Sequence, residues 1–157
     1  MNVYCKGIIN QMDMAVDSVI KLMNTLSDED LNIKPNAEKW SIGELLVHMS
    51  VLCKADLLIG LGNSEEELDR YYVETEPETN LKSIASTLID NYSFLRESIG
   101  ELDEKELLRV TTSFFGAVHS RYEWLLDKQA HFYHHRGQLH AMLVHVLKRE
   151  PNVQLFE

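Results

Sequence analysis

The sequence predicts an all-α fold, a four-helix bundle that occupies residues 1–157 as one domain. Apolar residues recur at three- and four-residue steps through four long segments, which is the period of a helix with one buried face. The chain has only seven glycines and three prolines, and the alternation typical of strands is rare. Four helices of about 20 to 28 residues with intermediate connections pack most economically as a bundle.

The first helix is expected from about residue 2 to about residue 26. Its apolar positions, with the expected spacing, are Val3, Ile8, Ile9, Met12, Val16, Val19, Ile20, Met23 and Leu26. The polar stretch that follows breaks this period, and Pro35 indicates a loop.

The second helix is expected to begin after Ser41, because Ser41 and Glu44 have the spacing of a capping box. In this motif the hydroxyl accepts a hydrogen bond from a free backbone N–H, and the carboxylate accepts one from the backbone of the cap residue. We expect this helix to run to about Leu61 and to end at Gly60 and Gly62.

Long connectors are predicted after the second and the third helix. Residues 63–79 are polar and acidic and suggest a surface connection, while 101–120 are apolar without a clear period and suggest a partly buried one. The third helix is expected over about 80–100. The fourth is expected over about 121–148 and stops before Pro151.

Composition excludes several classes of function. The hydrophobic content of 45% and the charged content of 25% are ordinary for a globular protein. A net charge of −10 argues against non-specific binding to nucleic acid or to an anionic membrane surface. No apolar run reaches the roughly 18 residues of a transmembrane helix, and the first residues lack the apolar centre of a signal peptide. We therefore expect a cytoplasmic protein in which Cys5 and Cys53 are buried thiols rather than a disulfide.

The stretch HFYHHRGQLH, residues 131–140, carries the strongest chemical signal. His131 and His135 are four residues apart, so on a helix both imidazoles share one face. Two imidazoles at this spacing can bind one metal ion. His48 stands alone in the second helix, where a histidine is more often a core residue than a ligand. If the two helices face each other, the three rings can converge.

Three imidazoles leave a metal such as Zn²⁺ one ligand short, so a water molecule or a substrate would complete its coordination, as in catalytic sites. Imidazole also suits Ni²⁺, Fe²⁺ and Cu²⁺, so the ligand type does not select the metal. Such a metal can acidify a bound water or thiol.

Several polar residues could orient these imidazoles by hydrogen bonding. Asp127 precedes His131 by four residues, Gln138 follows His135 by three, and Glu44 precedes His48 by four, although capping explains Glu44 more simply. Gly137 would be explained by close approach of another helix.

The other histidines are expected in packing or surface positions: His119, His134, His140 and His145. Core packing is also the expectation for most of these aromatic residues, although they could instead wall a pocket: Trp40, Tyr71, Tyr72, Phe114, Phe115, Tyr122, Trp124, Phe132 and Tyr133.

Two motifs resemble those of the DinB-like (DinB/YfiT) superfamily of bacterial metal-binding bundles. Residues 40–48, Trp-Ser-Ile-Gly-Glu followed by His48, resemble its W-[ST]-x-x-E-x-x-x-H signature. Residues 131–139 resemble its H-x-x-x-H-R-G-Q-[LI] signature. The stretch LNIKPNAEKW and residues 111–116 also look like the family's connectors, so the resemblance covers nearly the whole chain.

The resemblance implies a four-helix bundle with one divalent metal, zinc or nickel first, held by His48, His131 and His135. It also implies a homodimer and a small-molecule substrate. Characterised relatives include S-transferases and isomerases that use bacillithiol, mycothiol or glutathione, and their metal is thought to activate the thiol. The first hypothesis is therefore a metal-dependent thiol S-transferase.

Three alternatives stay open. One is a stress-related metal-binding module without turnover. Another is metal-assisted hydrolysis, which needs a general base such as Glu44 or Asp127. The last is a bundle whose histidines are packed and bind no metal.

Overall fold

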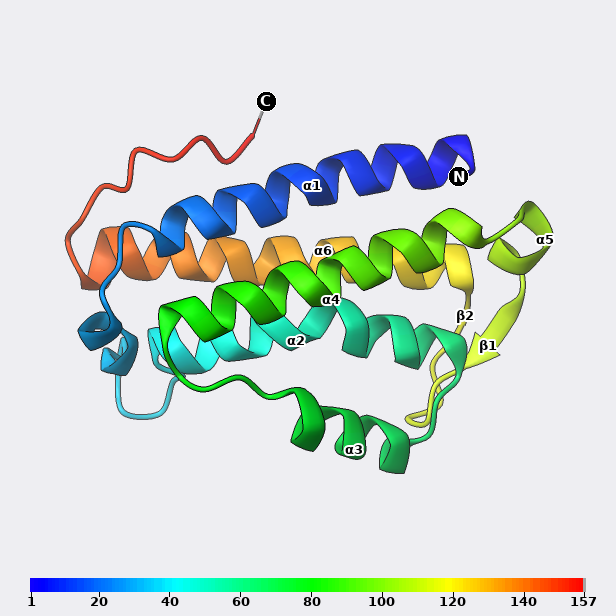
Figure 1. Ribbon diagram of the computed structural model, residues 1–157, viewed down its shortest axis with the longest axis horizontal. Coiled ribbons are helices and arrows are strands. Elements are labelled where there is room, and N and C mark those ends of the chain that lie inside the picture. The colour runs from blue at the N-terminus through cyan, green and yellow to red at the C-terminus, as the bar shows by residue number, and fades with distance from the viewer. Residues whose placement is uncertain (157) are drawn as a thin grey trace.

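A computed structural model describes residues 1–156 and confirms the predicted bundle. Its long helices are α1 (Val3–Met23), α2 (Ile42–Leu61), α4 (Leu81–Glu101) and α6 (Arg121–Ala141). They lie side by side along the long axis of the molecule (Figure 1). One continuous core of buried apolar side chains lies between them.

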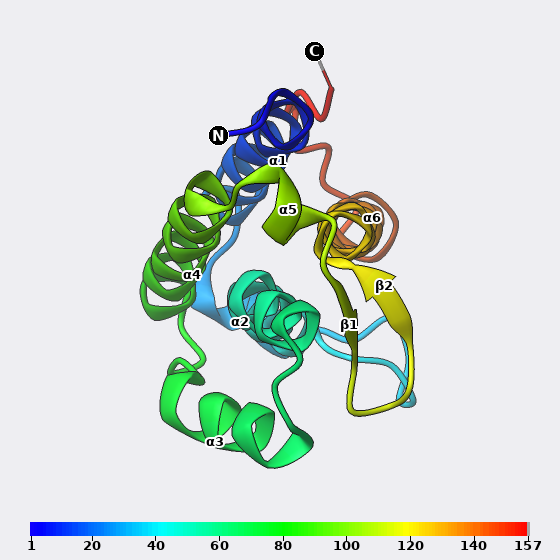
Figure 2. The same cartoon turned by 90° about the vertical axis from the view of Figure 1, so that its right-hand side faces the viewer.

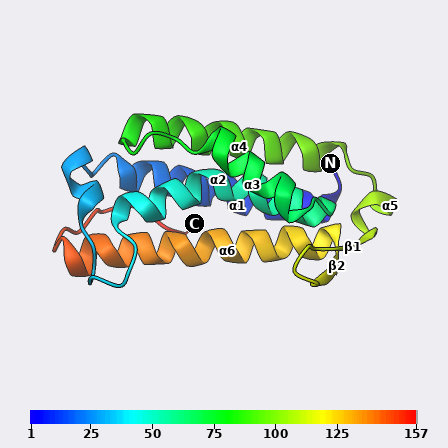
Figure 3. The same cartoon turned by 90° about the horizontal axis from the view of Figure 1, so that it is seen from below.

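The end-on view shows how the four helices surround this core (Figure 2). α2 packs against α4 and α6, and α1 packs against the same two helices from the opposite side. α2 and α4 run in one direction, and α1 and α6 in the other (Figure 1). Seen from below, α6 extends along almost the full length of the molecule (Figure 3). The histidine-bearing helices α2 and α6 are therefore direct neighbours.

The capping box predicted at the start of α2 is present. Ser41 Oγ accepts a hydrogen bond from the Glu44 backbone N–H at 3.1 Å, and Glu44 Oε2 accepts one from the Ser41 backbone N–H at 2.6 Å. The first helix is shorter than predicted: α1 ends at Met23, and a 3₁₀ turn follows over Asp28–Asn32.

The connection between α2 and α4 contains a helix that the sequence did not predict. α3 (Glu65–Thr75) covers the outer side of α2 (Figure 2). It is anchored by the buried residues Leu68 and Tyr71, whose hydroxyl donates to the Val51 carbonyl oxygen at 2.9 Å. The segment lies mostly on the surface, as expected, but its helix was not predicted because two apolar anchors are too few to produce a clear period in an acidic segment.

The second long connector is less buried than expected. It consists of the single helical turn α5 (Glu104–Leu107) and a hairpin of β1 (Val110–Thr112) and β2 (Val118–Ser120), with Thr111 opposite His119. Leu107 and Ser113 are buried, whereas most apolar residues of the hairpin are exposed.

The chain beyond α6 returns along the bundle. A π-helical turn, Met142–Val146, ends the regular helix earlier than predicted, and the last segment runs back beside α1 (Figure 1). Arg136 holds it by donating to the Leu155 carbonyl oxygen at 2.7 Å. Arg149 donates two hydrogen bonds to the buried Asp30, and these bonds lower the pKa of that carboxyl.

Close helix packing occurs at a different glycine from the one expected. A Cβ atom on Gly60 would lie 2.9 Å from the Trp124 Cβ atom, so Gly60 lets α6 approach α2. Gly137, for which close approach was predicted, has no such neighbour within 4 Å. Gly62 ends α2 in the left-handed conformation, as predicted.

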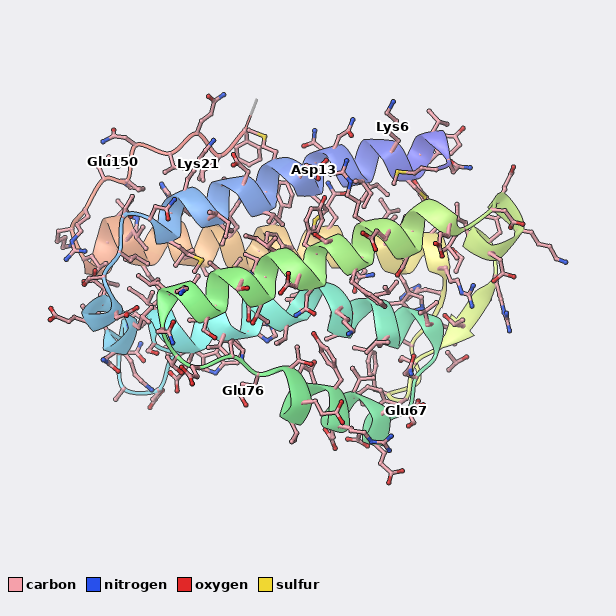
Figure 4. The ribbon with its side chains drawn as sticks, in the orientation of Figure 1. Lys6, Asp13, Lys21, Glu67, Glu76 and Glu150 are labelled. Carbon is pink, nitrogen blue, oxygen red and sulfur yellow. The ribbon has the colours of Figure 1, made fainter. Side chains whose placement is uncertain are left out.

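The core contains one lysine, Lys128, which is only 1% exposed. Burial lowers its pKa to about 8. Other charged side chains, such as Lys6, Lys21 and Glu67, lie on the outer surface (Figure 4). Across residues 1–156, no helix combines the length and apolar character required to cross a membrane.

Candidate metal centre

Three histidine side chains from two helices meet inside the bundle. His48 of α2 faces His131 and His135, which lie one turn apart on α6. His135 Nε2 lies 3.1 Å from His48 Nε2 and 2.9 Å from His131 Nε2. Within the described residues, these three histidines form a group that could hold a metal ion. The structure therefore supplies the convergence that the sequence alone left open.

The spacing of the ring nitrogens is close to that of ligands on one metal ion. Bonds of about 2.0 Å from a tetrahedral zinc place two imidazole nitrogens about 3.3 Å apart. The two measured separations involving His135 Nε2 are slightly shorter than this value. A small outward movement of the rings would therefore make room for an ion.

Hydrogen bonds behind two of the rings determine which nitrogen faces the centre. Asp56 Oδ2 lies 3.0 Å from His131 Nδ1, and Gln138 Oε1 lies 2.7 Å from His135 Nδ1. Both oxygens are acceptors, so each Nδ1 donates its proton outward and each Nε2 faces the centre. The two Nε2 atoms lie 2.9 Å apart, within hydrogen-bond distance when one of them carries a proton. A metal ion bound between them would take the place of that proton.

The protonation equilibria of the rings differ. Burial, followed by the charges of His135 and His131, lowers the pKa of His48 to about 4. Burial also lowers the pKa of His135, whereas the hydrogen bond to Asp56 raises the pKa of His131. His48 and His135 are therefore neutral at pH 7 and available as ligands, while His131 must release any proton that it holds.

Of the three residues predicted to orient the imidazoles, one is hydrogen-bonded to an imidazole and two are not. Gln138 bonds His135 as expected. The carboxylate of Glu44 is engaged by the Ser41 N–H and by Lys34 at 3.0 Å, and these contacts lower its pKa. Asp127 lines a cavity beside His131, but the hydrogen bond to that ring comes from Asp56.

Asp56 is the residue of this centre that sequence reasoning missed. Its side chain is 17% exposed and reaches His131 from the neighbouring helix α2. The available signal was a carboxylate within the otherwise apolar stretch of residues 55–61. A buried acid in such a setting usually has a partner, but the sequence does not show which one.

The other histidines lie outside the group. His134 is exposed, and its ring is 5.1 Å from the ring of His135. His119 is on β2 and packs edge-on against Trp124. His140 is half-buried and His145 exposed near the end of α6.

Several aromatic residues expected in the core are exposed instead. Trp40 is 51% exposed, and its ring lies 5.0 Å from the ring of His48 and 6.2 Å from that of His135. Tyr72, Phe114 and Phe115 are also exposed. The core expectation holds for Tyr71, Trp124 and Phe132, which are buried.

Three cavities reach the histidine group from different sides. One of ≈ 530 Å³ reaches His48, and one of ≈ 540 Å³ reaches His135, with Trp40 lining both. A third, of ≈ 280 Å³, is lined by His48 and His131. Small molecules can thus approach the three imidazoles from outside.

The protein is therefore a helical bundle with three inward-facing imidazoles that could hold a metal ion and that open cavities reach. The chain belongs to the DinB superfamily, whose family model matches residues 11–139. No curated protein matches the chain significantly.

Solved structures agree with this assignment. A protein assigned to the DinB family from Exiguobacterium sibiricum superimposes with a TM-score of 0.86 at 25% identity, over 99% of each chain. A DinB-like protein from Bacillus cereus has a TM-score of 0.72 at 22% identity, over 97% of this chain and 95% of that one. A DinB-like protein from Bacillus subtilis has a TM-score of 0.71 at 21% identity, over 94% and 95%. The two Bacillus structures share the fold.

Proposed function

We propose that the protein is a metal-dependent enzyme that transfers a low-molecular-weight thiol to an electrophilic small molecule. The observation that carries this proposal is the pair of inward-facing Nε2 atoms of His131 and His135, which Asp56 and Gln138 hold in place next to His48. Such an arrangement is suited to a cation. The resemblance to thiol-using members of the DinB-like superfamily supports the choice of reaction.

His48, His131 and His135 would hold one divalent ion, with zinc or nickel proposed first because imidazole suits both. An ion with three protein ligands lowers the pKa of a thiol or water that completes its coordination, and so supplies a nucleophile at neutral pH. The cavities beside His48 and His135 leave room for that ligand.

The chain's own thiols are unsuited to the role of nucleophile. Cys5 and Cys53 are both buried and free. Burial raises the pKa of Cys53 to about 12 and also raises that of Cys5, so both stay protonated at neutral pH. The reacting thiol is therefore proposed to come from solution, in the size class of bacillithiol, mycothiol or glutathione. It loses its proton, its sulfur bonds to the electrophilic carbon, and the leaving group departs with its bonding electrons.

Assays with the three thiols and a generic electrophile, 1-chloro-2,4-dinitrobenzene, test the proposed reaction. Metal-loaded protein should accelerate conjugation with at least one thiol, and the acceleration should disappear after chelation and in His135→Ala. Rates that equal the uncatalysed rate with every thiol, with or without metal, would contradict the proposal.

Hydrolysis is a second candidate, because Asp127 lines the same cavity as His131 and could act as a general base. Glu44 is less suited, since its carboxylate caps α2 and pairs with Lys34. Metal-dependent cleavage of a p-nitrophenyl ester that falls in Asp127→Asn, without thiol conjugation, would favour hydrolysis. Stoichiometric metal without either activity would favour the non-catalytic binding module.

The family resemblance also supports a homodimer. Light scattering during size-exclusion chromatography should then give twice the 18.1 kDa of one chain. A mass of one chain at micromolar concentration would contradict it.

A further inference from the structure

The cavity of ≈ 280 Å³ beside His131 differs in chemistry from the other two. It opens between the histidine-bearing helices α2 and α6 and the two long connectors. Tyr72 comes from α3, Phe115 from the turn of the hairpin and Trp124 from α6. Each of the two long connectors thus contributes one aromatic residue to its wall.

Three aromatic side chains line this cavity together with Leu52 and Ile59. Trp124 is 6% exposed, and its ring meets the Phe115 ring edge-on with centroids 6.3 Å apart. Phe115 is 59% exposed and Tyr72 37%. Exposure of large apolar rings costs free energy in water, and a ligand that covers Phe115 and Tyr72 would recover part of it.

The permanently charged groups that line this cavity are carboxylates, and the imidazoles of His48 and His131 are the other titratable groups in its lining. Asp56 and Asp127 contribute carboxylates, and among the described residues no lysine or arginine belongs to the lining. The Asp56 carboxylate already accepts the hydrogen bond from His131. Lys128 is buried in the core and lines a different cavity. Asp127 is exposed, and the hydrogen bond to His131 comes from Asp56 instead. The Asp127 carboxylate is therefore the one available to a ligand.

The other cavities are different in this respect. Lys34 and Glu44 form an ion pair in the one beside His48, and Glu38 and Lys39 line the one beside His135. Lysine side chains are thus available at the other two cavities, whereas among the described residues none lines the cavity beside His131.

We propose that the cavity formed by Tyr72, Phe115, Trp124 and Asp127 binds an organic cation, a protonated amine or quaternary ammonium group on an apolar body. Faces of aromatic rings attract cations, most strongly where water is excluded, and a carboxylate adds attraction of the same sign. The inference extends the proposed function, since this ligand is the electrophilic substrate, which would enter beside His131 while the thiol approaches from the lysine-bearing side.

The size of the cavity restricts the ligand. Small-molecule pockets usually enclose about 300–1,000 Å³, so this one accepts a small molecule or one end of a larger molecule. A compound with a carboxylate or phosphate at this position would face Asp127 and Asp56 and be repelled.

Calorimetric titration with three molecules that share a phenylpropyl body tests this inference. They are 3-phenylpropylammonium, 3-phenylpropan-1-ol and 3-phenylpropionate, titrated into metal-free protein with a chelator at pH 7.5. Omitting the metal prevents the amine or carboxylate from binding as its ligand. We expect the ammonium compound to bind about tenfold or more tightly than the alcohol, and the carboxylate most weakly.

Three variants locate the binding. Asp127→Asn removes a charge without changing shape, Phe115→Leu removes a ring, and Asp90→Asn on α4 removes a charge outside the cavity. The first two should weaken binding of the ammonium compound at least threefold by the same reasoning, and Asp90→Asn should match the wild type. Equal binding of all three compounds, preference for the carboxylate, or wild-type affinity in both cavity variants would overturn the inference. Because neither metal nor thiol is present, this outcome is separate from failure of the proposed enzyme activity.

Discussion

At the scale of single residues, Asp56 controls how His131 presents its ring. Its carboxylate accepts a hydrogen bond from Nδ1–H and thereby turns Nε2 toward His48 and His135. It also raises the basicity of the imidazole, as its effect on the pKa of His131 indicates.

Asp56→Asn should weaken metal binding by about tenfold to 100-fold, the usual cost of losing a partner behind a histidine ligand. The amide keeps the shape of the side chain but removes its charge. Competition with a fluorescent zinc chelator measures the affinity. Asp127→Asn is the matched control, because it removes a carboxylate from the same cavity without touching the hydrogen bond to His131. Equal affinities for wild type and Asp56→Asn would contradict this role.

The difference between the histidines and Asp56 shows what a sequence can predict at this scale. The pair at positions 131 and 135 follows from helical period alone, because both residues belong to one element. Convergence with His48, and the partnership with Asp56, depend on how α2 faces α6, which local spacing does not determine. The DinB-like motifs include the three histidines but not Asp56.

At the scale of elements, the contact between α2 and α6 is set by Gly60 rather than by Gly137. Both glycines lie inside helices, and a sequence pattern gives no means to tell which one faces a neighbour. The same limitation explains why helix α3 was not predicted. Its acidic face is clear in the sequence, but its two buried apolar residues are too few to indicate a buried face.

Substituting each glycine with alanine should change stability in opposite directions. Gly60→Ala places a methyl group 2.9 Å from Trp124 Cβ and should destabilise the protein by about 1–3 kcal/mol. Gly137→Ala meets nothing within 4 Å and should stabilise it by up to about 1 kcal/mol, because alanine favours the helix. Urea unfolding followed by circular dichroism measures both. If Gly60→Ala were as stable as Gly137→Ala, the described contact between the helices would be wrong.

At the scale of the whole molecule, Lys128 places a charge in the apolar core, and it is the core that stabilises the bundle. It shares a small cavity with Leu57, Ile99 and Leu102, where the ammonium form is poorly solvated. The bundle and its core follow from the apolar period, but a lysine in the apolar face was not predicted, because charged residues are rarely found fully buried.

Lys128→Met should stabilise the metal-free protein at pH 7 by roughly 1–3 kcal/mol, since methionine fills similar volume without a charge. The pKa is lowered to about 8 in the folded state from an ordinary value of 10.5. Between these two values the unfolded state binds more protons, so the penalty from Lys128 decreases as the pH rises. The advantage of Lys128→Met should therefore be largest below pH 8 and shrink toward pH 10.5. Urea unfolding of both proteins from pH 7 to pH 10 measures this difference, and an advantage that grows with pH would contradict the assignment.

α2 and α6 bring three imidazoles together, and we propose that these bind one metal ion. Elemental analysis of protein purified without a histidine tag, beside His48→Ala and His135→Ala, tests it most directly. We predict about one divalent metal per chain in the wild type and a loss in both variants, because two imidazoles leave the ion without a stable site. A wild-type protein that contains no metal, and gains none when titrated with zinc or nickel, would contradict the account.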